Sequence, residues 1–464
     1  MFPPDPESVA QSETQVEITD LGGPSAFNKV SKKFIQGKRI FSFHRRTWMT
    51  LATVVGIVVL GGIVLGNVWY QPKKEPVNDL PHIQYPVSLS VADGVCYATA
   101  TNGVVTALRI RDGSLLWHHT DAKTNEATAT VIDGIVYLVP LYPNDPTATT
   151  GTVEALRASD GVPLWFRTLP RDSRTLFHLT VVNNVVYIRS VANTIDAFRT
   201  SDGSLLRHYT AQTPIVSMAT DGTAFYVLTQ DGHLSALRAR SGSTIRMSTT
   251  LIPPQSSISV VADSMIFITL HDGGMEALQA STGVLLWHSS PSVPALALSP
   301  QPFVINDIVY TLTQDGHLFA LRTSSGSTMW HSTLSMRDGP PSLFALGDVI
   351  YIEMADGSVD AVSARSGSIL WHHQGGAEGT WVLLTATESV VYLASIAGMN
   401  ELGSITALRA SDGKSLWHST PSTHATQVIP AVAESLVLLP LQDGSINALR
   451  TENGSLRWHH TMDN

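Results

Sequence analysis

From about residue 86 to the C-terminus, short runs of alternating apolar and polar positions are separated by clusters of Gly, Asp, Asn and Ser. In the stretch 403–417, Ile405 and Ala407 alternate with Thr406 and Leu408. A period of two is typical of a β-strand, and the Ser-Asp-Gly that follows supplies the residues of a tight turn. The stretch therefore predicts two antiparallel strands joined by a hairpin turn.

The residue that ends this stretch returns at steps of 39 to 48 residues, which is a period typical of repeat architectures. Burial of one indole contributes about 4–6 kcal/mol before the entropy of ordering is subtracted. We therefore expect the repeated tryptophans to pack in a core. The repeated positions are Trp117, Trp165, Arg207, Arg246, Trp287, Trp330, Trp371, Trp417 and Trp458.

Each of the nine units offers four short strands, which in the seventh unit are expected at 342–346, 349–354, 358–363 and 368–372. The second of these strands is apolar on both sides of the pleat, so both faces of the sheet must be covered. Radial stacking of the units covers them, and it predicts an all-β closed β-propeller of four-stranded blades, eight or nine in number. A linear solenoid is the alternative, but it needs polar capping units that the first and ninth repeats do not resemble.

The region before the repeats has a different composition. Residues 1–46 form a polar tail that we expect to be disordered, and its last part is basic. Residues 47–70 include an uncharged stretch long enough to cross a bilayer as one helix, with aromatic residues at both ends. A short proline-rich linker, 71–85, leads to the repeats at 86–464.

The flanking charges orient this expected transmembrane helix. Between 29 and 46 the chain has lysines and arginines without any acidic residue, whereas only Lys73 and Lys74 follow the helix closely. The positive-inside rule then places the N-terminus in the cytoplasm and the propeller outside, anchored to the cytoplasmic membrane. A cleaved secretory signal is the alternative, and the long preceding tail and the absence of a small-residue cleavage site disfavour it.

Composition excludes some classes of function. With 464 residues, 43% apolar content and a net charge of −9, the chain can bury a large core and is not suited to general nucleic-acid binding. A single cysteine, Cys96, excludes an intrachain disulfide. Because Cys96 stands where other units have Val or Ile, we interpret it as a small hydrophobic residue.

The repeated Ala-Leu-x-Ala-x-x-Gly-x-x-x-Trp pattern, seen at 407–417 and nearly copied at 320–330, resembles the pyrroloquinoline-quinone (PQQ) repeat of the quinoprotein alcohol dehydrogenase-like propellers. The resemblance covers about 86–464 and implies the fold. Members of that superfamily typically have eight blades, and its dehydrogenases use a vicinal disulfide and a calcium ion beside the quinone. One cysteine cannot form that disulfide, so the resemblance points to a non-enzymatic branch and to no cofactor. PQQ with calcium is expected only if the protein is an oxidoreductase with an atypical site.

Two sets of repeated polar residues are candidates for a site. Histidines follow most repeat tryptophans, but equivalent positions on successive blades lie at least about 10 Å apart, too far to share a metal ion. Arginines follow the Ala-Leu pair, where they can pair with the Asp of the adjacent turn. We expect structural roles for both sets. The histidines are His118, His119, His208, His288, His331, His372, His373, His418, His459 and His460, and the arginines are Arg109, Arg157, Arg199, Arg238, Arg322, Arg409 and Arg450.

Long connections are expected on one face of the ring only, at 141–151, 289–301, 374–380 and 394–403. Variable loops on a rigid scaffold are where binding residues tend to lie. The sequence therefore predicts a non-catalytic scaffold or sensor that binds a protein or a cell-envelope ligand, with a PQQ-dependent oxidoreductase as the alternative. The candidate partner-binding residues are Tyr142, Asn144, Asp145, Met399, Asn400 and Glu401.

Overall fold

The computed structural model describes most of the repeat region. Two compact units divide the chain, Met1–Trp69 and Tyr70–Asn464, and every described residue belongs to the second. The expected tail (1–46), transmembrane helix (47–70) and linker (71–85) thus lie outside the described residues, among which no helix is long and apolar enough to cross a membrane. The described residues are 86–120, 127–140, 149–171, 177–239, 243–247, 251–254, 256–290, 302–313, 316–334, 342–354, 357–374, 382–397, 401–420 and 430–462.

The described strands form nine four-stranded antiparallel sheets, numbered here as blades 1 to 9. Blade 1 comprises β1 (Pro86–Ala92), β2 (Val95–Ala100), β3 (Val104–Arg109) and β4 (Leu115–Thr120). Blade 2 comprises β5 (Ala127–Ile132), β6 (Ile135–Pro140), β7 (Thr150–Arg157) and β8 (Pro163–Pro170). Blade 3 comprises β9 (His178–Val182), β10 (Val185–Val191), β11 (Thr194–Arg199) and β12 (Leu205–Thr210). Blade 4 comprises β13 (Ile215–Thr220), β14 (Ala224–Thr229), β15 (Leu234–Arg238) and β16 (Thr244–Met247).

The remaining five blades repeat this order. Blade 5 comprises β17 (Ser257–Ala262), β18 (Met265–Thr269), β19 (Met275–Gln279) and β20 (Leu285–Ser289). Blade 6 comprises β21 (Phe303–Ile305), β22 (Ile308–Leu312), β23 (His317–Arg322) and β24 (Thr328–Thr333). Blade 7 comprises β25 (Ser342–Leu346), β26 (Val349–Glu353), β27 (Val359–Ser363) and β28 (Ile369–His373). Blade 8 comprises β29 (Val382–Ala386), β30 (Val390–Ala397), β31 (Glu401–Arg409) and β32 (Ser415–Ser419). Blade 9 comprises β33 (Ala431–Ala433), β34 (Leu436–Pro440), β35 (Ser445–Arg450) and β36 (Leu456–Thr461).

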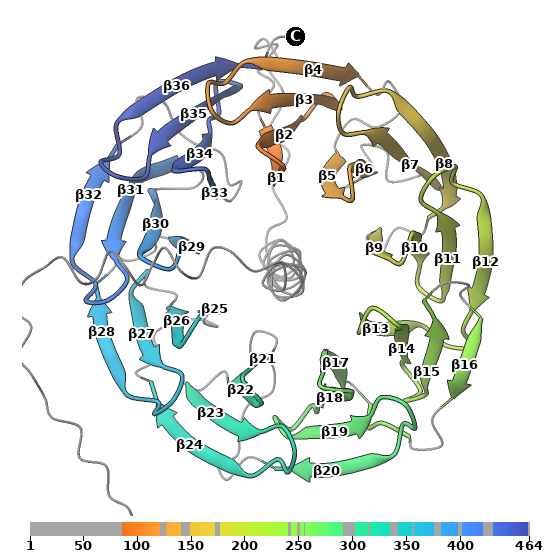
Figure 1. The fold of residues 1–464 in the computed structure, drawn as a ribbon. Helices are drawn as coiled ribbons and strands as arrows, with labels where there is room; N and C mark the ends of the chain where they lie inside the picture. Colours follow the sequence, from red (N-terminus) through yellow and green to blue (C-terminus); the bar gives the residue numbers. More distant parts are fainter. Residues whose placement is uncertain are drawn as a thin grey trace, which may run out of the picture. The chain divides into compact units, whose positions relative to one another are not determined.

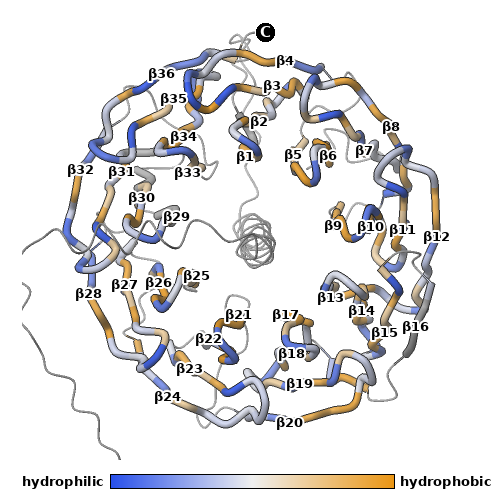
Figure 2. Tube along the Cα trace, in the orientation of Figure 1, coloured by the Kyte–Doolittle hydropathy of each residue, from blue (hydrophilic) through white to orange (hydrophobic). Residues whose placement is uncertain are grey.

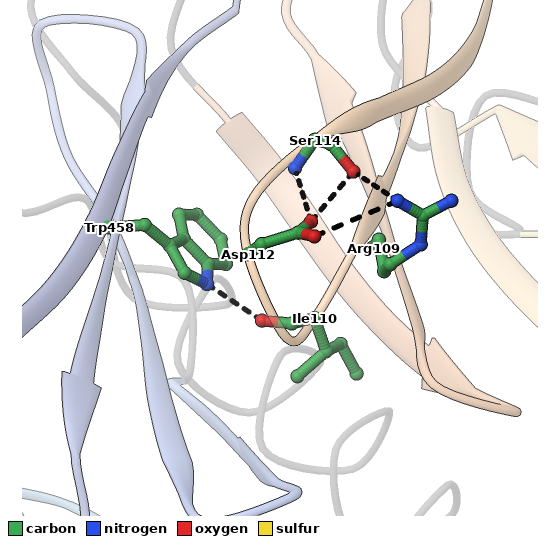
Figure 3. Close-up of polar contacts among 5 residues, drawn as sticks. All are labelled: Arg109, Ile110, Asp112, Ser114 and Trp458. Atoms are coloured by element: carbon green, nitrogen blue, oxygen red, sulfur yellow. Dashed lines mark hydrogen bonds and ion pairs between the residues drawn. The ribbon is translucent and has the colours of Figure 1, made fainter.

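The blades form a ring in which the first strand of each blade lies innermost and the fourth lies on the circumference (Figure 1). Blade 9 closes the ring by packing on blade 1. The Trp458 indole nitrogen donates a 2.7 Å hydrogen bond to the Ile110 carbonyl oxygen (Figure 3), and one apolar cluster joins Cys96 of blade 1 with Leu438 of blade 9. The predicted closed propeller is confirmed with nine blades, and the linear solenoid is wrong.

Each blade is a self-contained sheet of four consecutive strands, so among the described strands none is exchanged between the first and last blades. Closure therefore depends on side-chain packing and hydrogen bonds between complete blades. The second and third strands together carry most of the core, and all six residues of β14 are buried. Figure 2 shows further hydrophobic positions on fourth strands such as β8 and β20. Several of these are exposed, among them Leu205, Leu286, Ile369 and Leu456.

The tryptophans lie between blades, as predicted. Trp117 donates a 2.9 Å hydrogen bond from its indole nitrogen to the Ala158 carbonyl oxygen of blade 2, and it packs against the Tyr97 ring at 5.8 Å. Gly161 of blade 2 lies under the indole with a φ of +71°, and a Cβ there would stand 2.5 Å from a Trp117 ring carbon. The same pairing joins Trp165 with Gly203, Trp287 with Gly326, Trp330 with Gly367, Trp371 with Gly413, Trp417 with Gly454, and Trp458 with Gly113.

The innermost hairpins depend on residues that accept a positive φ. In blade 1 the turn between β1 and β2 is Asp93-Gly94, with φ angles of 49° and 77°. Such a pair is typical of a type I′ turn, whose twist matches that of the flanking strands, and Asp, Asn and Gly adopt it most readily. The Asp-Gly pair thus fixes the register of the hairpin, in which Ala92 pairs with Val95.

Candidate functional site

The two faces of the ring differ in their connections. The turn face carries the links between first and second strands, such as 93–94, and between third and fourth strands, such as 110–114; both kinds keep nearly the same length in every blade. The insertion face carries the links between second and third strands and between blades, which range from 192–193 to 290–302. This division follows from the sequential antiparallel order of the strands, and it confirms the one-sided distribution of long connections.

The bounds of the predicted insertions are partly wrong. Residues 394–403 were expected to form a long loop, but β30 extends to Ala397 and β31 begins at Glu401, with these two residues paired across the hairpin. The backbone pairing between β30 and β31 continues further than that between the second and third strands of the other blades. One register shift between Ser395 and Ile396 accommodates this extension. Only 398–400 is left as a connection. Two long connections that we did not expect stand out instead, 248–256 and 420–430.

The candidate partner-binding residues are placed as follows. Tyr142, Asn144 and Asp145 belong to the connection 141–149, and Met399 and Asn400 belong to 398–400; these five residues lie outside the described part of the chain. Glu401 is the first residue of β31 and is therefore a strand residue rather than a loop residue. The hairpin that Glu401 borders joins a second to a third strand and so belongs to the insertion face.

The turn face carries a circle of carboxylates that the sequence analysis missed. Eight of the nine innermost turns contain an acidic residue, at Asp93, Asp133, Asp221, Asp263, Asp307, Asp348, Glu388 and Glu434. Burial raises the pKa of Asp263, and the neighbouring carboxylate of Asp307 raises it further. The signal in the sequence was the acidic residue that recurs between the first two strands of almost every unit. The innermost turns are consequently nearly uniform in length and, outside blade 3, share an acidic residue.

The repeated arginines have the predicted structural role in four blades. Arg109 reaches Asp112 at 3.7 Å and the Ser114 hydroxyl at 2.7 Å (Figure 3). Hydrogen bonds from Ser114 lower the pKa of Asp112, and Arg109 and Arg111 add to this effect. The corresponding pairs are Arg157 with Asp160, Arg199 with Asp202, and Arg409 with Asp412. These contacts pair four of the seven repeated arginines with an acidic residue of the adjacent turn.

The repeated histidines cover a buried polar layer on the third strands. His208 contacts Asp196 at 2.6 Å and His372 contacts Asp360 at 2.7 Å, each within its own blade. His119, the second residue of its histidine pair, points the other way and contacts Glu154 of blade 2 at 3.1 Å. The predicted packing role is therefore confirmed for these histidines. The carboxylates beneath them were missed, although each occupies an alternating position of the third strand.

The described residues do not fit a quinone site. The only thiol, Cys96, is fully buried in the cluster between blades 9 and 1, and burial raises its pKa to about 12. The interpretation of Cys96 as a small hydrophobic residue is thus confirmed. A vicinal disulfide cannot form with one cysteine, and within the described ranges no three His, Cys, Asp or Glu residues lie close enough together to hold a metal ion.

Known proteins were compared with this chain at the level of sequence and of structure. A designed protein, Ika8, has a TM-score of 0.51 and 15% identity, covering 80% of this chain and 97% of its own. BamB from Moraxella catarrhalis has a TM-score of 0.48 and 17% identity, covering 66% and 90%. The C-terminal WD40 domain of Sif2 has a TM-score of 0.46 and 12% identity, covering 77% and 93%. No curated protein sequence matches.

The first of these is a similarity of fold alone, because its identity is low. The family evidence is of a different kind, since a family profile matches residues 102–264, 271–426 and 403–464, which is well over half of the chain. These segments contain the Trp–Gly pairs and Asp-Gly turns that build the blades. The chain belongs to the PQQ-repeat propeller family described as outer membrane protein assembly factor BamB.

Proposed function

We propose that this protein is a membrane-anchored, non-catalytic scaffold that binds a protein partner of the cell envelope through the insertion face. The observation that carries the proposal is the asymmetry of the ring. On the turn face every blade repeats the same short links, whereas the insertion face carries connections as different as 192–193, 141–149 and 290–302. Irregular loops held by a rigid framework are the usual location of recognition residues.

The framework is rigid enough for this role. Seven of the nine blade boundaries have a tryptophan bonded to the next blade, so the strands that bear the insertions are held at fixed positions around the ring. Membership of a family described as an envelope assembly factor supports a protein partner. A scaffold needs no nucleophile, and the thiol of Cys96 is buried and so is not available as one.

The proposed location follows from the sequence of the first 85 residues. An uncharged stretch at 47–70, basic residues before it and few after it place the propeller outside the cytoplasmic membrane. The structure supplies a convenient way to test this, because the only native thiol is inaccessible. Intact cells that produce Ser12→Cys or Asp160→Cys are treated with a membrane-impermeant maleimide. Only Asp160→Cys should react, and labelling of Ser12→Cys instead would reverse the proposed topology.

The binding face is tested by photo-crosslinking in cells. A photoreactive residue is placed at Asp145 or at Asn400 on the insertion face, and at Asp133 or Asp160 on the turn face of blade 2 as matched controls. Asp133 and Asp160 are both exposed. A protein adduct of constant mass should form from Asp145 and Asn400 and be absent from the controls. Adducts from the turn face alone would assign binding to the other side of the ring.

A further inference from the structure

Two histidines of blade 6 approach each other from neighbouring strands. The Nδ1 atom of His317, on β23, lies 3.0 Å from the Nε2 atom of His331, on β24. The pair is diagonal in the ladder, since His317 is paired with Thr333 and His331 with Phe319. His331 is exposed and His317 is half-buried, so both nitrogens are within reach of solutes.

The separation of the two nitrogens is that of two ligands of one metal ion. Imidazole nitrogens lie about 2.0–2.1 Å from zinc, and nitrogen ligands of copper(II) lie at a similar distance. Two such ligands are then about 2.9 Å apart at a right angle and about 3.4 Å apart at the tetrahedral angle. The observed 3.0 Å is close to the right-angle value, which suits adjacent positions of a square-planar copper(II) ion.

The surroundings hold the two rings in place. The Phe319 ring is stacked on His331 with centroids 4.5 Å apart and planes inclined by 18°. This contact fixes the direction of the His331 ring. The Thr333 hydroxyl lies 3.2 Å from Nδ1 of His317, where it can support that ring or compete weakly for the nitrogen.

Blade 6 is unusual among the nine blades in having both histidines. Three residues before the alanine that pairs with the tryptophan or arginine position, where blade 6 has His317, the other blades have Val104, Thr152, Thr194, His233, Gly274, Ser358, Ser404 and Ser445. Blade 4 has a histidine, His233, directly before its third strand, but Met247 at the position of His331. Blade 8 has the fourth-strand histidine, His418, but Ser404 at the position of His317. Neither blade can form the pair, so each supplies a natural control.

We propose that His317 and His331 form a two-histidine binding site for a first-row divalent cation, with copper(II) preferred over zinc(II). The two imidazoles supply one edge of the coordination shell, and water supplies the remaining ligands. The bound ion joins β23 to β24 on the outer part of blade 6. This site is independent of the proposed insertion-face scaffold, so each can fail without the other.

The test is titration of the full-length chain in detergent with copper(II) alone, followed by calorimetry and by electron paramagnetic resonance. At one equivalent the spectrum should show two nitrogen ligands. His317→Ala and His331→Ala should each weaken the tightest site by on the order of 100-fold, because one imidazole loses the advantage of chelation. His233→Ala and His418→Ala should leave it unchanged.

Two outcomes would overturn the proposal. One is an unchanged isotherm in both His317→Ala and His331→Ala, which would reduce the 3.0 Å contact to a hydrogen bond between the rings. The other is an equal loss in His418→Ala, which would mean that copper(II) binds surface histidines without preference. The unfolding midpoint without metal is measured for every variant, so that a folding defect is recognised. His331→Gln, which keeps a polar side chain without an imidazole, serves as the second variant if His331→Ala is unstable.

Discussion

Seven blade boundaries are closed by a tryptophan, whereas the two boundaries of blade 4 are closed without one. At the boundary of blades 9 and 1, Trp458 bonds to Ile110 and covers Gly113. At the boundary of blades 3 and 4, Arg207 occupies the tryptophan position and is exposed. Arg246 occupies that position at the boundary of blades 4 and 5. The ring therefore has two kinds of contact between blades.

Blade 4 uses inner residues instead of an outer indole. Tyr187 stacks on Phe225 with centroids 4.6 Å apart, and its hydroxyl donates a 3.0 Å hydrogen bond to the Arg238 carbonyl oxygen. Arg189 donates to the Ile215 carbonyl oxygen at 2.8 Å. The boundary of blades 4 and 5 is filled by an apolar cluster that includes Tyr226 and Ile258. Closure of the ring thus requires that side chains fill the space between neighbouring blades. A tryptophan fills it at seven boundaries, and inner aromatic and aliphatic residues fill it at the two boundaries of blade 4.

The boundary of blades 3 and 4 also contains a histidine whose charge is disfavoured in the folded protein. His178 is paired in the ladder with Arg189 and contacts the Thr180 hydroxyl at 3.3 Å. Burial, and to a smaller extent the positive charge of Arg189, together lower the pKa of His178 to about 4. Protonation of His178 therefore opposes folding at this boundary.

The largest expected effect is that of removing the closing indole. Trp458→Ala should lower the free energy of unfolding by about 3–5 kcal/mol, because it removes a buried aromatic ring and the hydrogen bond to Ile110. Denaturant unfolding followed by circular dichroism measures it. Leu456→Ala, two residues away and 55% exposed, should change stability by less than about 0.5 kcal/mol. Equal effects of the two would mean that the indole does not close the ring.

The next effect separates close packing from backbone strain. Gly113→Ala adds a Cβ 2.6 Å from the Trp458 ring at a φ of +71°, whereas Gly134→Ala meets nothing within 4 Å at a φ of +75°. Gly134→Ala should cost roughly 1–2 kcal/mol from conformation alone. Gly113→Ala should cost about 1–3 kcal/mol more because of overpacking. Unfolding of both variants checks this, and equal losses would show that the indole moves aside freely.

The smallest effect concerns the boundary without tryptophan. Because the folded pKa of His178 lies near 4 and that of an unfolded histidine near 6.5, the unfolded state binds the proton more readily. Stability should therefore fall as pH drops from about 6.5 to 4, by at most about 3 kcal/mol. His178→Gln should flatten this part of the unfolding profile. A profile of unchanged slope would show that other groups cause the acid sensitivity.

The sequence predicted the blades well because their determinants are local. The Asp-Gly pairs select hairpin turns, the alternation places one set of side chains inward, and the repeated tryptophan marks the outer strand. In blade 7 the four expected strands agree with β25, β26, β27 and β28 to within one residue at each end. The error at 394–403 came from treating the residues between the second and third strands as a loop. Such residues can extend a strand when the neighbouring strand is extended by the same length and pairs with them.

The candidate site was predicted less completely. The face that carries the long connections follows from strand order, so the sequence located it. The contact between His317 and His331 was missed because we compared equivalent positions on successive blades, whereas this pair joins different positions within one blade. Diagonal neighbours on paired strands become visible only once the register is known.

The sequence by itself determined the repeat, the four-stranded unit and the position of the indole in each blade, since these depend on residues close together in the chain. Tertiary structure decided the closure of the ring at nine blades, because closure depends on the angle between packed sheets and on contacts such as that of Trp458 with Ile110, 348 residues apart. It also decided that blade 4 needs no tryptophan. Packing in three dimensions fills the same space with different residues, and no single repeat encodes that outcome.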